Sequence, residues 1–337
     1  MKAFEISGIK SCRYLDLEPP KLESDDSVIV KVKCVGICGS DIHSYTHGLN
    51  TPVIPGHEVV GTVVEAGKNV TKIRVGDHVV LEPLVSCGTC YACRKGKRNV
   101  CREAKCLGCQ LDGGMREYFQ YDQEHWHKIP ENLPWKSAVL IEPYTVGLEV
   151  VSRGRVQAGD TVLIHGAGPA GLIAMDMANK LGATCIVSEV VEGRLEQARN
   201  LGAAYTINPK QEDLRARVKE ITNGEGPNVI IDAAGLPFML EQSVEMVSNA
   251  GRIVLMGIGL GEAKFTMIWC TAKEVDIVGS RMQQARFQPV IENCFDHLSH
   301  ADKLVTDVFP FTQAAEAIAL AAQAAPHTAK VVVEFPD

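Results

Sequence analysis

A glycine-rich turn between an apolar stretch and a helical stretch constrains the fold of this chain more than any other feature. The turn reads Gly166-Ala167-Gly168-Pro169-Ala170-Gly171 and directly follows the apolar run TVLIH. Glycines at these places allow a tight turn, let the backbone approach a pyrophosphate, and leave the N–H groups of a helix N-terminus facing the anion. The sequence therefore predicts a strand–turn–helix unit that binds a dinucleotide, although a glycine turn that serves only packing is the alternative.

An acidic residue closes the next predicted strand. Glu189 follows the first glycine of the turn by about 20 residues, where a carboxylate hydrogen-bonds the adenosine ribose hydroxyls. A 2′-phosphate would lie against this charge, so the sequence favours NAD and makes NADP the less favoured cofactor. Ser188 and Arg194 are the neighbours that argue for NADP instead.

Short apolar stretches separated by helical lengths of chain continue after the glycine turn. They lie at 185–189, 204–207, 229–232, 253–256 and 275–278. This alternation predicts an α/β fold with a doubly wound parallel sheet, the Rossmann arrangement, over residues 146–286. Residues 1–145 instead carry short alternating stretches and glycines, which predict a separate β-rich domain. A predicted helix at 314–325 and a strand at 330–335 return to that first domain, so that residues 287–337 complete it.

The charge and hydropathy of the chain exclude several classes of partner. The 34 Lys and Arg residues against 41 Asp and Glu give a net charge of −7, which disfavours nucleic acid and anionic membrane surfaces. No stretch offers about 20 consecutive apolar residues, and the N-terminus has no export signal. We therefore expect a cytoplasmic protein that acts on a small molecule.

Four cysteines gather in one short segment. Cys87, Cys90, Cys93 and Cys101 form C-x2-C-x2-C-x7-C, a pattern typical of a closed tetrahedral zinc site with a structural role. The cations between them, at Arg94, Lys95, Lys97 and Arg98, are expected to lower the cost of four thiolates. A disulfide or a redox-active pair is the alternative. Cys106 and Cys109 form a further C-x2-C whose role the sequence leaves open between ligand substitution and free thiols.

Three further segments carry competent zinc ligands, and their order along the chain resembles a known family. Cys38 lies in GICGSDIH, His57 and Glu58 lie in GHEVVGTVVEAG, and Glu142 lies in IEPYTVG. With VGDHVV, the four-cysteine segment, GAGPAG and GRIVLMG, these motifs are similar to those of the zinc-dependent medium-chain dehydrogenases over essentially the whole chain. The resemblance implies a GroES-like catalytic domain beside the Rossmann domain, with catalysis in the cleft between them.

The resemblance also implies a second zinc ion, with a catalytic role. Cys38, His57 and Glu58 would hold this ion, and Glu142 would bind it directly or through water at the place where alcohol dehydrogenases carry a cysteine. A carboxylate in place of a thiolate hardens the site and makes its ion more exchangeable. Two zinc ions per chain are therefore expected. Such an ion acts as a Lewis acid toward a hydroxyl group, whose hydride then passes to the nicotinamide.

The family pattern gives roles to four further residues. Asp41 would fix the tautomer of His57, unless it serves only as a helix cap. Ser40 and His43 match a proton relay, although an ordinary surface histidine is the alternative for His43. Arg281, in VGSRMQ, resembles an arginine that contacts substrate hydroxyls or cofactor, and a surface arginine is the alternative there.

Within the family, the chain is most similar to the sorbitol, polyol and sugar-acid branch. LGCQLDGG at 107–114 and the IEPY segment resemble the galactonate or gulonate 5-dehydrogenase type. We therefore expect oxidation of a secondary alcohol of a polyol, sugar or aldonate, in a homodimer or homotetramer. The alternatives are an L-threonine 3-dehydrogenase-like or other zinc alcohol dehydrogenase, a zinc-free NADPH reductase, and an NAD-sensing regulatory protein.

Overall fold

The computed structural model describes residues 1–293, 302–323 and 325–336, and the chain divides into two units. Unit 1 comprises Met1–Glu142 and Phe287–Asp337, and unit 2 comprises Pro143–Arg286. The division falls three residues before the domain boundary expected at 145/146 and coincides with the one expected at 286/287. No helix among the described residues is long and apolar enough to cross a membrane.

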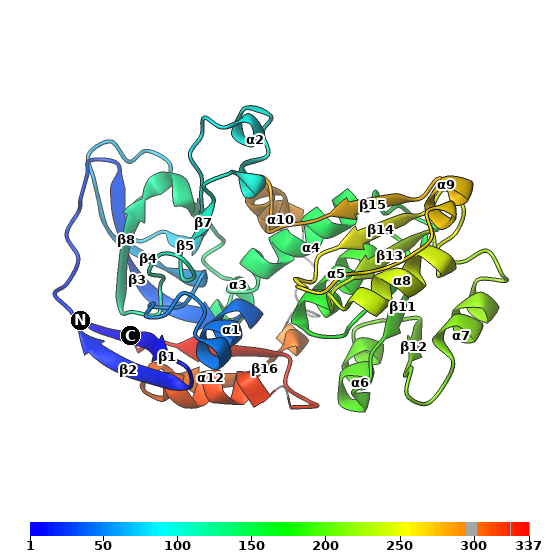
Figure 1. Ribbon diagram of the computed structural model, residues 1–337. Helices are drawn as coiled ribbons and strands as arrows, with labels where there is room; N and C mark the ends of the chain where they lie inside the picture. Colours follow the sequence, from blue (N-terminus) through cyan, green and yellow to red (C-terminus); the bar gives the residue numbers. More distant parts are fainter. Residues whose placement is uncertain (294–301, 324, 337) are drawn as a thin grey trace. The chain divides into compact units, whose positions relative to one another are not determined.

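Unit 2 is a six-stranded parallel sheet with helices between its strands (Figure 1). Its strands are β10 (Thr161–His165), β11 (Thr184–Ser188), β12 (Tyr205–Ile207), β13 (Val229–Asp232), β14 (Arg252–Leu255) and β15 (Asp276–Gly279). Its helices are α5 (Pro169–Lys180), α6 (Glu192–Asn200), α7 (Leu214–Ile221), α8 (Pro237–Met246) and α9 (Ile268–Lys273), while α4 (Ile141–Arg153) begins at the end of unit 1. The strands lie within two residues of the stretches predicted from the sequence.

The strand order in unit 2 is β12-β11-β10-β13-β14-β15, the doubly wound order. The order reverses between β10 and β13, which is the place where doubly wound sheets bind their ligands, outside the carboxyl ends of the strands. Leu163, Ile186, Ile230 and Ile253 on neighbouring strands are fully buried, as a sheet covered on both faces requires. The glycine turn follows β10 at this reversal point.

Unit 1 contains a mostly antiparallel sheet in the order β16-β17-β3-β4-β5-β9, with β8 paired to β3. The strands of the unit are β1 (Lys2–Gly8), β2 (Ser11–Asp16), β3 (Ser27–Gly36), β4 (Glu58–Ala66), β5 (His78–Leu81), β6 (Leu84–Val85), β7 (Lys105–Cys106), β8 (Tyr118–Asp122), β9 (Trp126–Lys128), β16 (Val305–Pro310) and β17 (Lys330–Glu334). Its helices are α1 (Gly39–His47), α2 (Tyr91–Arg94), α3 (Trp135–Ala138), α10 (Phe287–Asn293) and α12 (Ala314–Gln323).

The end of the chain returns to the sheet of unit 1. Strand β17 pairs antiparallel with β3, with Val333 opposite Val35, and the red C-terminal segment lies among the blue N-terminal strands in Figure 1. Helix α12 packs its buried Ala317 and Ile318 into the same core as Val331 and Val333 of β17. This return brings Lys330, near the end of the chain, next to Glu58, one of the ligands predicted near its beginning.

Candidate active site

Cys38 and Asp41 are positioned by the start of helix α1. The chain leaves β3 at Gly36, and Cys38 is the N-cap of the helix. The Cys38 backbone N–H donates to Asp41 Oδ2 at 2.8 Å, which satisfies one of the N–H groups that a helix N-terminus leaves unpaired. The other oxygen, Asp41 Oδ1, is buried, lies 4.0 Å from His57 Nδ1 and accepts no hydrogen bond from the described residues. Asp41 therefore caps the helix and also faces the histidine.

The register of two paired strands brings His57 and Glu58 next to Cys38. Glu58 is the first residue of β4 and lies opposite Gly36, the last residue of β3. A Cβ on Gly36 would lie 2.0 Å from Glu58 Oε2, so only glycine leaves room for this carboxylate. One ligand atom each from Cys38, His57 and Glu58 lies within 4.8 Å of the other two. The structure thus gathers three of the predicted ligands of the catalytic ion.

Lys330 completes this cluster, and sequence reasoning missed it. Its ammonium donates to both oxygens of Glu58, at 2.6 and 2.8 Å, and to the carbonyl oxygen of Ile37 at 3.2 Å. Burial lowers the pKa of Lys330, but Glu58 and neighbouring acidic groups outweigh it and the pKa is raised. The only signal in the sequence is a lysine at the start of the apolar strand KVVVEF, which does not reveal its partner.

Glu142 is a buried carboxyl group in the first turn of α4, and its pKa depends on the charges of the same cluster. Its pKa is raised to about 7, mainly because it is buried and also by the charge of Glu58, while His57 and Lys330 oppose this rise. Burial lowers the pKa of His57. The sulfurs of Cys38 and Cys109 have the opposite and larger effect and raise this pKa well above its usual value. A sulfur, an imidazole and the carboxylate of Glu58 converge here, with the carboxyl group of Glu142 close enough to interact with them electrostatically. This donor set fits a zinc ion.

Cys109 and Ser40 also lie at this cluster. Cys109 Sγ is 3.8 Å from His57 Nδ1 and 3.7 Å from Ser40 Oγ. The thiol of Cys106 and the charge of His57 lower the pKa of Cys109 to about 4. His43 lies three residues after Ser40 on the exposed face of α1, its ring 5.6 Å from that of His47. The relay expected for Ser40 and His43 stays a prediction.

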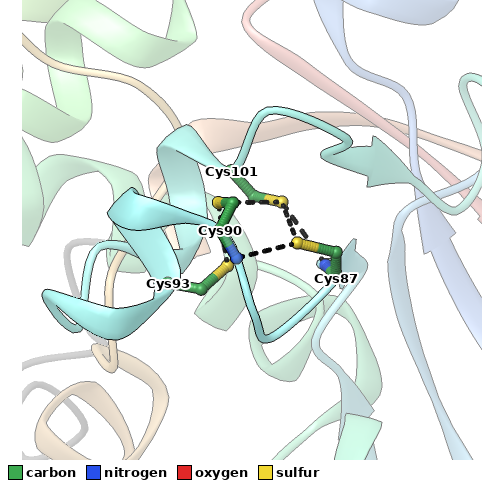
Figure 2. A group of neighbouring side chains, drawn as sticks. All are labelled: Cys87, Cys90, Cys93 and Cys101. Carbon is green, nitrogen blue, oxygen red and sulfur yellow. Dashed lines mark hydrogen bonds between the residues drawn. The ribbon is translucent and has the colours of Figure 1, made fainter.

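The four cysteines of the second predicted zinc site converge in the loop around α2 (Figure 2). The Sγ–Sγ distances are 3.6 Å for Cys90–Cys93, 3.8 Å for Cys90–Cys101 and 3.5 Å for Cys87–Cys101. Ligands at about 2.3 Å from a tetrahedral zinc ion lie about 3.8 Å apart, so the four sulfurs fit the ion with no position left open.

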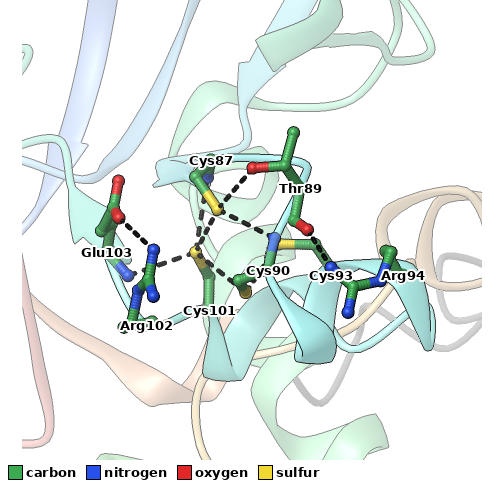
Figure 3. A network of polar contacts seen from close by, with 8 residues as sticks. All are labelled: Cys87, Thr89, Cys90, Cys93, Arg94, Cys101, Arg102 and Glu103. Atoms are coloured by element: carbon green, nitrogen blue, oxygen red, sulfur yellow. Dashed lines mark hydrogen bonds and ion pairs between the residues drawn. The ribbon is translucent and has the colours of Figure 1, made fainter.

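Backbone N–H groups lower the pKa of two of these thiols, Cys87 and Cys90, whereas burial and the neighbouring thiols raise the pKa of Cys93 to about 11 (Figures 2 and 3). The N–H groups of Cys90 and Cys87 donate to Cys87 Sγ and Cys101 Sγ, both at 3.3 Å. Such bonds from its neighbours lower the pKa of Cys90 to about 6. The four cations predicted to assist are all exposed, and Arg94, for example, donates to the carbonyl oxygen of Thr89. Backbone dipoles are therefore the nearer source of stabilisation.

The predicted nucleotide residues lie together in unit 2. Gly166 adopts φ +95°, Gly168 caps helix α5, and Pro169 is the first residue of that helix. A Cβ on Gly171 would lie 2.0 Å from the carbonyl oxygen of Gly166, so the helix can pack against the turn only with glycine there. Ala170 lies between Pro169 and Gly171. These three residues of the first turn bear no side chain large enough to cover the free N–H groups.

Glu189 faces the glycine turn, as expected. Its Oε2 accepts from the Ala167 N–H at 3.0 Å, and its Oε1 accepts from the N–H groups of Val190 and Val191. Arg194 Nη1 lies 3.8 Å from Glu189 Oε2, so the cation that argued for NADP is directed at this carboxylate. Arg281 lies after β15 in unit 2 and is exposed, and its contact with substrate or cofactor stays a prediction.

Comparison with known proteins places the chain in a family. Residues 24–131 match the alcohol dehydrogenase GroES-like domain, and residues 169–296 match the zinc-binding dehydrogenase domain. The starvation-sensing protein RspB of Escherichia coli is 39% identical over the whole of both chains. The chain belongs to the zinc-dependent medium-chain dehydrogenases. Sorbitol dehydrogenase of Bacillus subtilis is 34% identical to this dehydrogenase, over all of this chain and 98% of its own.

A solved structure agrees with this assignment. The crystal structure of the RspB alcohol dehydrogenase from E. coli, complexed with NADH, is 37% identical and covers 99% of each chain with a TM-score of 0.94. The predicted combination of a GroES-like domain and a Rossmann domain is confirmed. The dehydrogenase is an enzyme of the zinc-type alcohol and polyol oxidoreductases.

Proposed function

We propose that this dehydrogenase oxidises a secondary alcohol of a polyol, sugar or aldonate, of the galactonate or gulonate type, and transfers the hydride to NAD. The convergence of Cys38, His57 and Glu58 carries this proposal, because it offers an ion sulfur, nitrogen and oxygen ligands and still leaves a position for substrate. The relatives named sorbitol dehydrogenase and RspB support the branch. Two zinc ions per chain follow from this cluster and the four-cysteine site.

The side chains around the proposed catalytic ion have separate tasks. A zinc ion supplies Lewis acidity toward an alcohol oxygen, and NAD supplies the hydride acceptor. Asp41 holds the orientation and tautomer of His57 through its free oxygen. The Ser40 hydroxyl would accept the proton of the substrate hydroxyl while it donates its own to a ribose hydroxyl of the cofactor, and His43, on the exposed side of α1, would take the proton from that ribose and release it to water. Arg281 orients the hydroxyl groups of the substrate or the cofactor.

The preference for NAD rests on Glu189. Its carboxylate closes the glycine turn at the place where a ribose hydroxyl would be bound, and Arg194 is engaged with that carboxylate. Glu189→Ala is expected to weaken NAD binding more than NADP binding, because the variant loses the ribose acceptor and releases Arg194 for a phosphate. Titration of both cofactors, followed by protein fluorescence, measures this. Equal losses for the two cofactors would contradict the proposal.

A substrate panel tests the reaction itself. Polyols and aldonates of four to seven carbons, with L-threonine and simple alcohols as the competing classes, are offered with NAD and NADP, and nicotinamide absorbance reports turnover. We expect the highest kcat/KM for a polyol or aldonate. A higher kcat/KM for threonine would reassign the substrate class, and absence of turnover on the whole panel despite NAD binding would refute the proposal.

Metal content tests the two-ion assignment. Elemental analysis is expected to give about two zinc ions per chain, and mild chelation is expected to remove activity while the circular dichroism of the fold persists. The reason is that the ion with a carboxylate ligand exchanges more readily than the ion held by four thiolates. An active enzyme with one non-exchangeable ion would contradict the assignment.

We also propose a homodimer or homotetramer that resides in the cytoplasm. Strand β15 ends the sheet of unit 2, and near it Ile258, Leu260 and Met267 are almost fully exposed, which favours burial against a second copy. All cysteines in the described part of the chain are free thiols, as in a reducing compartment. Light scattering after gel filtration measures the assembly, and a monomer would contradict it.

A further inference from the structure

Cys106 and Cys109 form a thiol pair at the candidate active site that the proposed mechanism does not use. Cys106 ends β7, which pairs with β6 just before the four-cysteine loop. Cys109 follows in a tight turn, in which its N–H donates to the carbonyl oxygen of Cys106 at 3.1 Å. Both side chains are half-buried and neither forms a disulfide. The pair is therefore available for chemistry at this cluster.

Close backbone contacts hold this turn against the segment that carries His57. Gly108 adopts φ +82°, and a Cβ there would lie 2.5 Å from the carbonyl carbon of Gly56, the residue before His57. The Gly114 N–H donates to the carbonyl oxygen of Gly56 at 2.8 Å. The backbone thus holds the turn that carries the two thiols beside His57.

The donor atoms of this group have the spacing of a metal site. One ligand atom each from His57, Cys106 and Cys109 lies within 4.8 Å of the other two, and Cys109 Sγ is 3.8 Å from His57 Nδ1. A sulfur at about 2.3 Å and a nitrogen at about 2.0 Å from one tetrahedral zinc ion are about 3.5 Å apart. Small side-chain movements therefore bring the three donors onto a single ion. An ion here takes the nitrogen that Asp41 Oδ1 faces at 4.0 Å, so this position and the contact with Asp41 exclude one another.

The buried ammonium of Lys330 weakens the competing ligand set, Cys38, His57 and Glu58. Both oxygens of Glu58 already accept from the Lys330 ammonium, at 2.6 and 2.8 Å, so an ion bound by Glu58 must share it. Cys109 Sγ instead lies 3.7 Å from the hydroxyl group of Ser40 and 3.8 Å from the imidazole of His57, and neither contact is with a lysine or an arginine. Zinc binds thiolate and imidazole strongly. The two thiols are therefore competitive ligands for the same ion.

We propose that His57, Cys106 and Cys109 form a second ion position that overlaps the Cys38, His57, Glu58 position and shares His57 with it. One ion occupies one position at a time, and the thiolate position retains the ion when the other loses a ligand. This inference rests on the proposed metal centre, and it adds two ligands that the mechanism above does not contain.

Zinc content of variants tests the overlap. We expect about two ions per chain in the wild type and in Cys38→Ser, because the thiolate position retains the ion. We expect about one ion, that of the four-cysteine loop, in the triple variant C38S/C106S/C109S. The matched control C38S/C12S/C270S changes two half-buried cysteines outside the cluster and should retain about two ions. Circular dichroism and retention of the loop's ion verify that each variant is folded.

Two outcomes of this comparison would overturn the proposal. One is loss of the second ion from Cys38→Ser alone. The other is its retention in the triple variant, which would show that Glu58 and Glu142 hold it without the thiols. Loss of the ion from C106S/C109S while Cys38 is intact would instead support the thiolate position and overturn the proposed catalytic set. The failure of one proposal is thus distinguishable from the failure of the other.

Alkylation of individual thiols gives a second readout that does not depend on activity. In zinc-loaded Cys38→Ser, where the ion is held by the thiolate position, Cys106 and Cys109 are expected to react with iodoacetamide at least about tenfold more slowly than after mild chelation of the same variant, because a bound thiolate is a poor nucleophile. Mass spectrometry of the peptides reports each site, with Cys270 as the control whose rate does not change. Equal rates with and without zinc would overturn the proposal, as would recovery of the two residues as a Cys106–Cys109 disulfide from protein purified without oxidant.

Discussion

Replacement of Lys330 by methionine tests the electrostatics of the candidate active site. The side chains of Lys330 and Glu58 are 3% and 1% exposed, and the ammonium donates to both carboxylate oxygens and to the carbonyl oxygen of Ile37. Methionine keeps the length and apolar stem of the lysine but removes all three hydrogen bonds. Glu58 is then a buried charge whose remaining cationic neighbours are the imidazole of His57 and any bound ion.

The expected loss of stability is large for a single substitution. Removal of one partner from a buried ion pair costs about 3–5 kcal/mol, since the other charge stays desolvated. In a domain of this size, each kcal/mol shifts the melting temperature by about 2–4 °C, so zinc-depleted K330M should melt about 6–20 °C below the wild type. A bound ion compensates the charge of Glu58, so the difference should be smaller in zinc-loaded protein.

Differential scanning calorimetry of both proteins, with and without zinc, measures this effect. The double variant K330M/E58Q isolates its cause, because it leaves an amide in place of the buried charge and should recover more than half of the lost stability. A conservative control, Lys330→Arg, keeps the charge. Two results would refute the reasoning: K330M that melts with the wild type in the absence of zinc, or a double variant no more stable than K330M.

Three further substitutions have definite expected outcomes. Gly171→Ala places a methyl group 2.0 Å from the carbonyl oxygen of Gly166 and should weaken NAD at least about tenfold while zinc content is unchanged; unchanged affinity by titration would contradict the close packing. Cys93→Ser should release the loop's zinc and lower the melting temperature, measured by elemental analysis and calorimetry, and a retained ion would contradict a four-ligand site. In zinc-free protein, Glu142 has its pKa raised from 4.5 to about 7, so stability should fall by up to roughly 3 kcal/mol as pH rises from about 4 to 7, because the unfolded chain ionises first. Glu142→Gln should remove most of this slope in urea titrations, and an unchanged slope would assign it elsewhere.

The sequence is most informative where a local pattern has a single physical explanation. The glycine turn and Glu189 could be predicted because a tight turn, a strand end and a helix start are set by neighbouring residues. The four-cysteine loop could be predicted for the same reason, since all its ligands lie within fifteen residues of one another. In both cases the residues that approach one another are close in the sequence, and the structure brings the named residues together.

Contacts between distant segments could not be predicted in the same way. Lys330 reaches Glu58 only because β17 pairs with β3, and that pairing depends on the fold of the whole unit. The approach of Cys109 to His57 depends in turn on Gly108 packing against Gly56, which no periodicity in the sequence reveals. Cys38, His57 and Glu58 were connected only by resemblance to a family, since nothing local shows that they meet.

The placement of the metal ligands explains why the reaction class is easier to infer than the substrate. Cys38 caps a helix after the end of β3, Glu58 begins the strand paired with β3, and His57 directly precedes it, so backbone hydrogen bonds fix their spacing. Loop changes can therefore alter which hydroxyl group is presented without moving the ion. A shared ligand set thus transfers the chemistry between relatives, whereas the choice among polyols and aldonates must come from side chains outside that set. Kinetic comparison of substrates is consequently the measurement that separates members of this family.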